Sequence, residues 1–234
     1  MAVSPALRAE RSRIHDELLA EHTLMRRGAA LVTVSFSALA DGRPVDVRTL
    51  VATTRWLIEF VHGQRASEAE LLWPVLRGLF PGPVAELAGM VVEREALDAE
   101  LHTLARAVDT IAAREVTGGR GEVLVVVGEA AMTGLPSALR VQSILNRNLD
   151  DEEPLLLDLF PRVPDRDVAR LRGAIVHGAP RTGPHLVFGL LEDPDRVPGH
   201  TALLGNFPAS VRWLRRVFLT RYRSTKRALG VPAL

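Results

Sequence analysis

Cysteine is absent from this chain of 234 residues. A chain without cysteine forms no disulfide, and thiolate catalysis and cysteine-ligated zinc or iron–sulfur sites are excluded. Lysine is nearly absent too, because Lys226 stands alone among arginines, and the formal net charge is only +1. So small a charge gives no overall attraction to nucleic acid or to a membrane surface.

Long apolar runs are also missing. No stretch reaches the roughly 18 consecutive apolar residues of a membrane-spanning helix, and the charged first residues lack the apolar core of a signal peptide. We therefore expect a cytoplasmic protein that binds neither nucleic acid nor a membrane.

What the sequence does contain is helical periodicity. Apolar residues recur at spacings of three and four over residues 5–31, 47–80, 84–115 and about 139–160. A breaker cluster predicts a turn within residues 32–45, Asp46 is a predicted N-cap, and the Pro-Gly-Pro sequence at 81–83 is predicted to end the second helix. Four long helices with short connections predict an all-α, up-down-up-down four-helix bundle over residues 1–163.

Residues 164–234 form a predicted C-terminal extension of shorter helices at 167–177, about 185–192 and 209–229. We expect this extension to pack on the bundle or to form a dimer contact, which leaves a homodimer open. Seven cationic residues lie between Arg212 and Arg227 without any acid. No nucleic-acid motif accompanies them, so we interpret them as a solvated helix face.

One stretch gives a mixed signal. The β-branched run at 123–127 has strand propensity, but it has no obvious partner strand among long helices, so it is expected to be helix or extended linker. The glycine-rich sequence at 118–121 is interpreted as a linker, because the strand and helix that flank a phosphate-binding loop are missing.

Two segments, 64–74 and 148–158, share a polar motif. In each, a carboxamide is followed four positions later by glutamate and then by a Leu-Leu pair, giving the couples Gln64/Glu68 and Asn148/Glu152. Residues four apart share one face of a helix. Each segment therefore directs a polar couple to one side.

The pattern over residues 11–160 resembles the hemerythrin-like (HHE cation-binding) family, and the tail is similar to the extension of an actinobacterial branch of it. The resemblance depends on His15 in Ile-His-Asp, on Glu68 before Leu-Leu-Trp-Pro, and on the segments 90–101 and 149–153. The resemblance implies a four-helix bundle that holds two irons with about five histidines and two carboxylates.

Matched position by position, the resemblance retains few of these ligands. His15 matches the histidine of the first helix and Glu68 the carboxylate of the second. Histidines of the family are replaced by Gln64, Arg94, Asp98 and Asn148. The last acidic ligand survives as Glu152 or Glu153. Because a guanidinium cannot ligate a metal, we interpret the site as one that has lost its di-iron centre and needs no cofactor.

We hypothesise that the former iron pocket binds a small organic molecule. His15 paired with Glu68 or Glu153 would act as general acid or base, and Arg94 would stabilise an anion. The polar residues expected to bind substrate are Gln64, Asp98, Asn148 and Glu152. Isomerisation, cyclisation or elimination in bacterial secondary metabolism fits such a set.

Two alternatives remain open. The polar set could be structural in a non-catalytic ligand-binding or interaction bundle, which is also the simplest interpretation of His22 and His102 as structural or half-exposed residues. A third hypothesis is a non-heme iron protein, with metal bound by His15, Glu68, Asp98 and Glu153. Iron analysis would separate this third hypothesis from the first.

Overall fold

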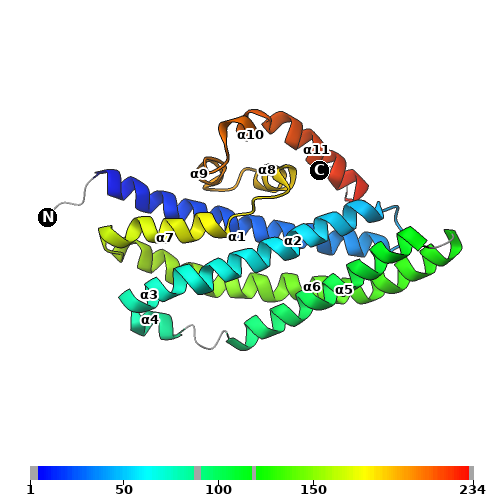
Figure 1. The fold of residues 1–234 in the computed structure, drawn as a ribbon, viewed down its shortest axis with the longest axis horizontal. Coiled ribbons are helices and arrows are strands. Elements are labelled where there is room, and N and C mark those ends of the chain that lie inside the picture. Colours follow the sequence, from blue (N-terminus) through cyan, green and yellow to red (C-terminus); the bar gives the residue numbers. More distant parts are fainter. Residues whose placement is uncertain (1–4, 87–90, 118–119, 232–234) are drawn as a thin grey trace.

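The computed structural model describes residues 5–86, 91–117 and 120–231 (Figure 1). Every regular element in these ranges is a helix, which confirms the prediction of an all-α protein. None of the described helices is long and apolar enough to cross a membrane. The long helices are α1 (Pro5–Ala40), α2 (Val47–Ser67), α5 (Val91–Thr117) and α6 (Arg120–Leu159).

Shorter helices extend or follow the long ones. A π-helical turn η1 (Glu68–Leu72) leads from α2 into α3 (Trp73–Leu79) and α4 (Pro81–Glu86). A 3₁₀ turn η3 (Phe160–Arg162) ends α6. The C-terminal helices are α7 (Asp165–Gly178), α8 (Pro184–Glu192), α9 (His200–Leu204), α10 (Ala209–Trp213) and α11 (Arg215–Ala228).

The long helices lie side by side. Helix α1 packs against α6 and α2, α2 also packs against α5, and α5 packs against α6. Consecutive long helices run in opposite directions in Figure 1. Helix α7 packs against α1, α2 and η1, so the chain after residue 164 covers part of the long helices.

The first helix is longer than the sequence predicted. It continues to Ala40, so the expected turn is wrong for residues 32–40. This segment is rich in valine, serine and threonine, which favour helix only weakly. Burial of Val32 and Phe36 on the packed face, and a hydrogen bond of 2.7 Å from Ser35 Oγ to Leu31 O, keep it helical.

The second helix begins as predicted. The backbone N–H of Thr49 donates to Asp46 Oδ1 at 2.8 Å, so Asp46 is the N-cap. Near the other end, Trp73 N–H donates to Glu68 O, five residues back, in the π-helical turn η1. Pro74 follows in the first turn of α3, where its missing N–H costs little. Such π turns are frequent at functional sites.

Two further helix boundaries differ from the predictions. Residues 81–86 form α4, so the predicted start of the third helix at 84 is wrong, and residues 87–90 lie outside the described residues. Helix α6 begins at Arg120 and contains both Pro136 and Pro154. The run at 123–127 is therefore helical, one of the two conformations expected for it. Within the predicted linker at 118–121, residues 118 and 119 are not described.

The C-terminal helices at 167–177 and 185–192 are confirmed, whereas the one expected at 209–229 is divided at Leu214 into α10 and α11. Helix α11 packs on α8, and α8 and α9 pack on α1. A Cβ added to Gly189 would lie 2.0 Å from the ring of Tyr222. Glycine at this position therefore allows the close approach of α11 to α8.

The buried apolar residues form two clusters along the long helices. On α1, Leu18 belongs to one cluster and Leu24 to the other. On α2 and its continuation, one cluster ends at Val61 and the other begins at Leu72. On α6, the first cluster ends at Leu149 and the second begins at Leu156. Buried polar residues fill the gap on every one of these helices. The molecule therefore has a polar layer between two apolar cores.

Candidate functional site

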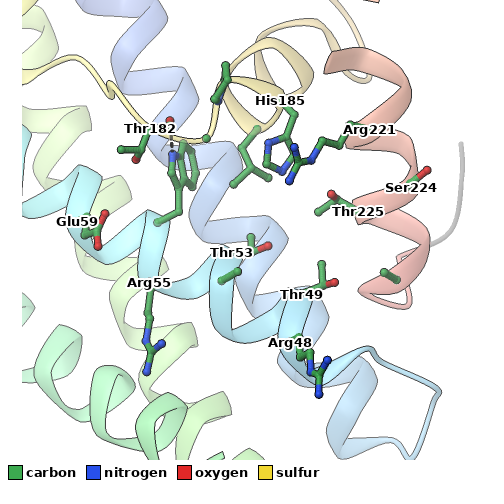
Figure 2. Close-up of a pocket in the computed structure, with 16 residues that line it drawn as sticks. Arg48, Thr49, Thr53, Arg55, Glu59, Thr182, His185, Arg221, Ser224 and Thr225 are labelled. Atoms are coloured by element: carbon green, nitrogen blue, oxygen red, sulfur yellow. Dashed lines mark hydrogen bonds between the residues drawn. The ribbon is translucent and has the colours of Figure 1, made fainter. Parts of the chain in front are cut away.

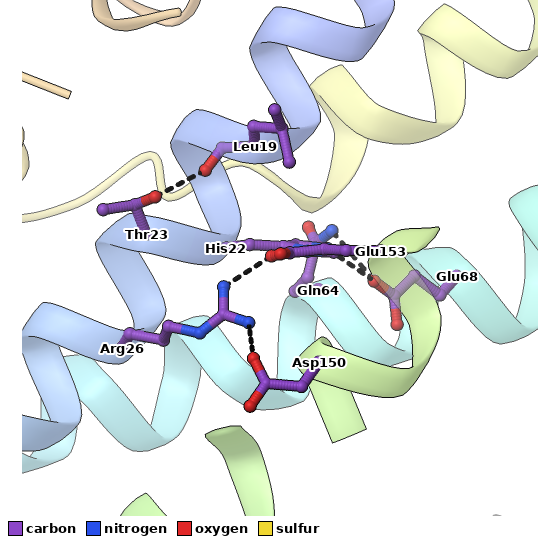
Figure 3. A network of polar contacts seen from close by, with 8 residues as sticks. All are labelled: Leu19, His22, Thr23, Arg26, Gln64, Glu68, Asp150 and Glu153. Atoms are coloured by element: carbon purple, nitrogen blue, oxygen red, sulfur yellow. Dashed lines mark hydrogen bonds and ion pairs between the residues drawn. The ribbon is translucent and has the colours of Figure 1, made fainter. Parts of the chain in front are cut away.

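The polar layer consists of five side chains from three helical segments: His22, Gln64, Glu68, Glu152 and Glu153. They come from α1, from α2 with its π-helical turn η1, and from α6, and Figure 3 shows all of them except Glu152. His22 is completely buried, and Gln64, Glu68 and Glu152 retain at most 8% of their accessible surface. Burial of this many ionisable groups is unfavourable unless they pair or change protonation state.

His22 is held by a carboxylate. Its Nδ1 lies 2.9 Å from Glu153 Oε1, a hydrogen bond that joins α1 to α6. The same oxygen accepts from Arg26 Nη1 at 2.5 Å, and Arg26 Nη2 donates to Asp150 Oδ1 at 2.7 Å (Figure 3). Because Nδ1 donates to Glu153, the ring orientation of His22 is fixed and Nε2 points to the other side.

The second ring nitrogen of His22 faces Glu68. His22 Nε2 lies 4.0 Å from Glu68 Oε1, which is beyond hydrogen-bond distance, and it has no hydrogen-bond partner among the described residues. Gln64 Nε2 donates to the same Glu68 oxygen at 3.2 Å. The layer therefore contains a buried imidazole nitrogen and a carboxyl group that face each other without a direct bond.

Two carboxyl groups of the layer titrate near neutral pH. Burial raises the pKa of Glu68 to about 7, although Gln64 and the charge of Arg94 lower it. Burial, and then the charge of Glu68, raise the pKa of Glu152 to about 8. Both groups can therefore hold or release a proton at physiological pH.

Glu153 has the opposite behaviour. Burial raises its pKa, but the hydrogen bonds from His22 and Arg26 outweigh this and bring the pKa to about 2. Glu153 is thus a permanent carboxylate at neutral pH. The layer combines one fixed anion with two carboxyl groups that exchange protons.

A second set of buried acids continues the layer along α1. Glu17 accepts from Arg13 Nε at 2.9 Å and from Asn206 Nδ2 at 3.2 Å, and its other oxygen lies 3.4 Å from Arg172 Nε. Glu21 is fully buried, and neither of its carboxyl oxygens has a hydrogen-bond partner among the described residues. Burial, followed by the charges of Glu17 and Glu68, raises its pKa well above the ordinary value.

Helix α7 packs tightly over one side of the layer. A Cβ added to Gly178 would lie 2.0 Å from Gln64 Oε1, so any larger residue would displace the side chain of Gln64. Next to it, Ser67 Oγ donates to Ala174 O at 2.6 Å. The amide of Gln64 is therefore clamped between α7 and Glu68.

Some predicted site residues lie in this layer and others do not. Gln64, Glu68, Glu152 and Glu153 are brought together. Asn148 is 7% exposed, one turn before Glu152 on α6, and its Oδ1 has no hydrogen-bond partner among the described residues. Glu68 and Glu152, one from each of the two repeated motifs, lie close enough for the charge of Glu68 to raise the pKa of Glu152.

The remaining predicted residues lie at the edge or outside. Arg94 is 32% exposed in its side chain, and its Nη2 lies 3.6 Å from Glu152 Oε1. Asp98 is mainly exposed and pairs with Arg65. His15 is 36% exposed in its side chain, and its Nδ1 lies 3.4 Å from Asp16 Oδ1. The expected pairing of His15 with Glu68 or Glu153 is not found, because His22 occupies that place.

Sequence reasoning missed three members of this region: Glu17, Glu21 and Arg26. His15 and His22 share a face of α1 but are separated by about 10 Å along its axis. Only His22 lies level with Glu68. The sequence did contain a signal for these residues. Glu17 and Glu21, and likewise His22 and Arg26, are four positions apart, so they extend a polar face along α1 among buried leucines.

The donor set does not fit the di-iron centre implied by the resemblance. Among the described residues, no three His, Asp or Glu side chains converge on a point where they could hold a metal ion. Only one imidazole lies in the layer, and Arg26 and Arg94 bring guanidinium charge to its carboxylates. A cation at the same place would be repelled by these charges.

Comparisons of the chain with family models, with curated proteins and with solved structures find no match. The resemblance to hemerythrin-like proteins therefore depends on the residues quoted for it.

Proposed function

We propose that this chain is a hemerythrin-like, up-down-up-down four-helix bundle in which the polar layer stands in place of the iron centre. The antiparallel order of α1, α2, α5 and α6 supports the bundle. The location of Gln64, Glu68 and Glu152 on the inner faces of α2 and α6 supports the match to former ligand positions.

We propose further that the layer performs metal-independent acid/base chemistry on a small organic molecule, as in an isomerisation, a cyclisation or an elimination. The observation that carries this proposal is the pair formed by His22 Nε2 and Glu68 Oε1, 4.0 Å apart, with Nε2 buried and unbonded among the described residues. A buried polar atom without a partner is unfavourable unless a further group binds it.

The roles follow from the geometry. The permanent carboxylate of Glu153 accepts from His22 Nδ1 and so orients the ring, as a carboxylate does for a catalytic histidine. His22 Nε2 and Glu68 then exchange a proton with a substrate atom that lies beside the pair, within hydrogen-bond distance of both. Glu152, with a pKa of about 8, supplies a second proton donor at neutral pH.

Access to the layer comes from the side of Arg94. The side chains of Arg94 and Glu153 retain 32% and 21% of their exposure, whereas those of His22 and Glu68 retain 0% and 10%. Displacement of the 3.6 Å contact between Arg94 and Glu152 would admit an anionic or carbonyl-bearing substrate. Its oxygen would then take the place of Glu152 beside the guanidinium.

Proton exchange with solvent tests this proposal. The protein is incubated in D₂O with a panel of enolisable carbonyl compounds, and the loss of C–H signals is followed by NMR. Exchange is expected to slow by about 100-fold or more in Glu68→Gln and Glu152→Gln. Asp158→Asn, an exposed acid farther along α6, is the matched control and retains the rate. Exchange that is equally fast in all variants contradicts the proposal.

A non-catalytic bundle is the second candidate, and a specific observation favours it. The cleft of about 720 Å³ between α2, α8 and α11 is lined entirely by residues outside the polar layer. In that case the layer fixes the relative positions of α1, α2 and α6. This second candidate predicts two results together. Glu68→Gln and Glu152→Gln change the free energy of unfolding, and the wild-type protein catalyses no proton exchange with any compound of the panel.

A further inference from the structure

A cleft with no residue of the polar layer in its lining lies between α2, α8 and α11 (Figure 2). Its volume is about 720 Å³. Sites for small molecules commonly measure roughly 300–1,000 Å³. Its lining includes Thr53, Trp56, His185, Arg221 and Thr225.

Two threonines of the cleft have unpaired hydroxyl groups. Thr53 on α2 and Thr225 on α11 are 3% and 8% exposed, and neither hydroxyl has a hydrogen-bond partner among the described residues. Threonines within helices ordinarily donate to the carbonyl four residues earlier. Thr23, Thr103, Thr110, Thr133 and Thr220 do so in this chain, whereas Thr54, on α2 but outside the cleft lining, also has an unpaired hydroxyl among the described residues.

The contrast between these threonines has a physical meaning. Neither the Thr53 nor the Thr225 hydroxyl is fully enclosed, so each is open to the cleft and available to water or to a polar group of a ligand. Figure 2 shows the side chains of Thr53 and Thr225 directed into the cleft from facing helices. Both therefore present a donor and an acceptor to the same space.

One end of the cleft carries Arg221, while the other arginines of the lining, Arg48 and Arg55, lie along α2. Arg221 of α11 reaches toward the ring of His185 at the start of α8 (Figure 2), and the structure gives its guanidinium no carboxylate partner among the described residues. Glu59, the acid of the lining, lies at the opposite end. The N-terminus of α8 begins at Pro184 beside His185 and adds its own partial positive charge.

Burial, followed by the charge of Arg221, lowers the pKa of His185. The ring is therefore neutral at physiological pH, with one nitrogen that donates and one that accepts. A neutral imidazole beside a guanidinium suits an anion with a further polar substituent.

The wall of the cleft is apolar and firmly packed. Trp56 Nε1 donates to Thr182 O at 3.1 Å. A Cβ added to Gly183, whose φ is +61°, would lie 2.7 Å from the Trp56 ring. The indole is therefore held in place between α2 and the start of α8. It offers a fixed surface for the apolar body of a ligand.

We propose that this cleft binds a small organic anion, in which a carboxylate or a phosphate is attached to an apolar body. The anionic group contacts Arg221, His185 and the N-terminus of α8. Hydroxyl or carbonyl groups of the ligand bind Thr53 and Thr225, and the apolar body packs against Trp56. This site lies apart from the polar layer and does not depend on the acid/base proposal.

Calorimetric titration of the full chain tests the site with three probes that share one ring: benzoate, phenyl phosphate and benzyl alcohol. The first two distinguish a carboxylate from a phosphate, and the third lacks the charge. We expect at least one anion to bind with a dissociation constant of about 1 mM or lower, and benzyl alcohol to bind at least about tenfold more weakly.

Variants of α11 then locate the bound anion. Arg221→Gln is expected to weaken binding by about tenfold or more, because it removes a charge-assisted hydrogen bond. Arg223→Gln, two residues along the same helix and outside the cleft lining, removes an equal charge as the matched control and changes affinity by less than about twofold. Thr53→Val, which preserves the side-chain shape, is expected to weaken binding several-fold.

The outcomes separate cleanly. Binding of either anion with a selective loss in Arg221→Gln supports the site, and the preferred probe identifies its anionic group. Three results would overturn it: neither anion binds, benzyl alcohol binds as well as benzoate, or Arg221→Gln and Arg223→Gln weaken binding equally.

Discussion

The Nδ1 of His22 lies 2.9 Å from Glu153 Oε1, across the interface between α1 and α6. This contact fixes which ring nitrogen faces the rest of the polar layer, and it keeps Glu153 ionised. The other ring nitrogen then faces a carboxyl group, Glu68, whose pKa of about 7 allows it to keep its proton at physiological pH. Opposite protonation states of neighbouring carboxyl groups are the basis of the predictions below.

Replacement of Glu153 by glutamine is expected to lower the free energy of unfolding by about 1–3 kcal/mol, because His22 and Arg26 lose the charge of their shared partner. Asp150→Asn removes the other, exposed partner of Arg26 and is the control, with an expected cost below about 1 kcal/mol. Urea denaturation at pH 7 measures both. If the two substitutions lower the free energy of unfolding equally, the contact with Glu153 contributes no more to stability than the exposed contact with Asp150.

The lowered pKa of Glu153 also predicts how the stability of the protein depends on pH in the acid range. Its pKa falls from an ordinary value of 4.5 to about 2 in the folded protein. Its stabilising contribution is therefore complete above about pH 4.5 and is lost as the pH falls through 2. Acid denaturation of Glu153→Gln, followed by circular dichroism, should show a smaller loss of stability over this range than the wild-type protein. If stability falls as steeply in Glu153→Gln as in the wild-type protein below about pH 4.5, the lowered pKa of Glu153 is contradicted.

Glu68 and Glu152 predict the reverse dependence at higher pH. Their pKa values rise from 4.5 to about 7 and about 8, so the folded protein binds protons that the unfolded chain has released. Stability therefore falls as the pH rises from about 5 to 8, by up to roughly 1.4 kcal/mol per pH unit for each group.

Glutamine at either position removes one titrating group and tests this dependence. Denaturation midpoints between pH 5 and pH 9 should decline less steeply in Glu152→Gln than in the wild-type protein, and the variant should be the more stable one at pH 9. Glu100→Gln, a partly exposed acid of α5, is the control and leaves the slope unchanged. A wild-type protein that gains stability from pH 5 to pH 8 would be inconsistent with protonated carboxyl groups in the layer.

Gly178→Ala is expected to destabilise the protein by about 1–3 kcal/mol, since the new methyl group would lie 2.0 Å from Gln64 Oε1. Gly173→Ala on the same helix meets no atom within 4 Å and is expected to be neutral or stabilising by up to about 1 kcal/mol. The cost of Gly178→Ala should shrink in a Gln64→Ala background, where the clash is removed. If Gly178→Ala costs as much in the Gln64→Ala background as in the wild-type protein, the added methyl group does not act through Gln64.

Iron content distinguishes the layer from a metal centre. Protein purified from iron-supplemented culture is expected to contain far less than one iron per chain, because Arg26 and Arg94 neutralise the carboxylates and one imidazole is too few for such a site. Elemental analysis and an absorption spectrum provide the measurement. Near-stoichiometric iron, retained after dialysis against a chelator, would contradict the proposed loss of the metal site.

Much of the fold follows from local patterns in the sequence. Helical periodicity predicted an all-α protein, and Asp46 is the cap that its side chain suggested. Helix boundaries were predicted less well where tertiary packing overrides propensity. Residues 32–40 of α1 are poor helix formers that stay helical because Phe36 packs inside.

The site was predicted in part for a similar reason. Spacing of four within one helix identified the couples Gln64/Glu68 and Asn148/Glu152, since both members lie on the same helix face. It could not determine which turn of α1 would lie level with them. His15 and His22 are equivalent in helical phase, and only the packing of α1 against α6 brings His22 to Glu153.

The central claim is that the polar layer holds protons on Glu68 and Glu152 near neutral pH. The most direct test is an NMR titration of the side-chain carboxyl carbons in ¹³C-glutamate-labelled protein, with Glu68→Gln and Glu152→Gln to assign the signals. The account predicts two carboxyl groups that titrate near pH 7 and pH 8, each lost in its own variant. Titration of every glutamate below about pH 5, within the ordinary range for exposed carboxyl groups, would contradict it.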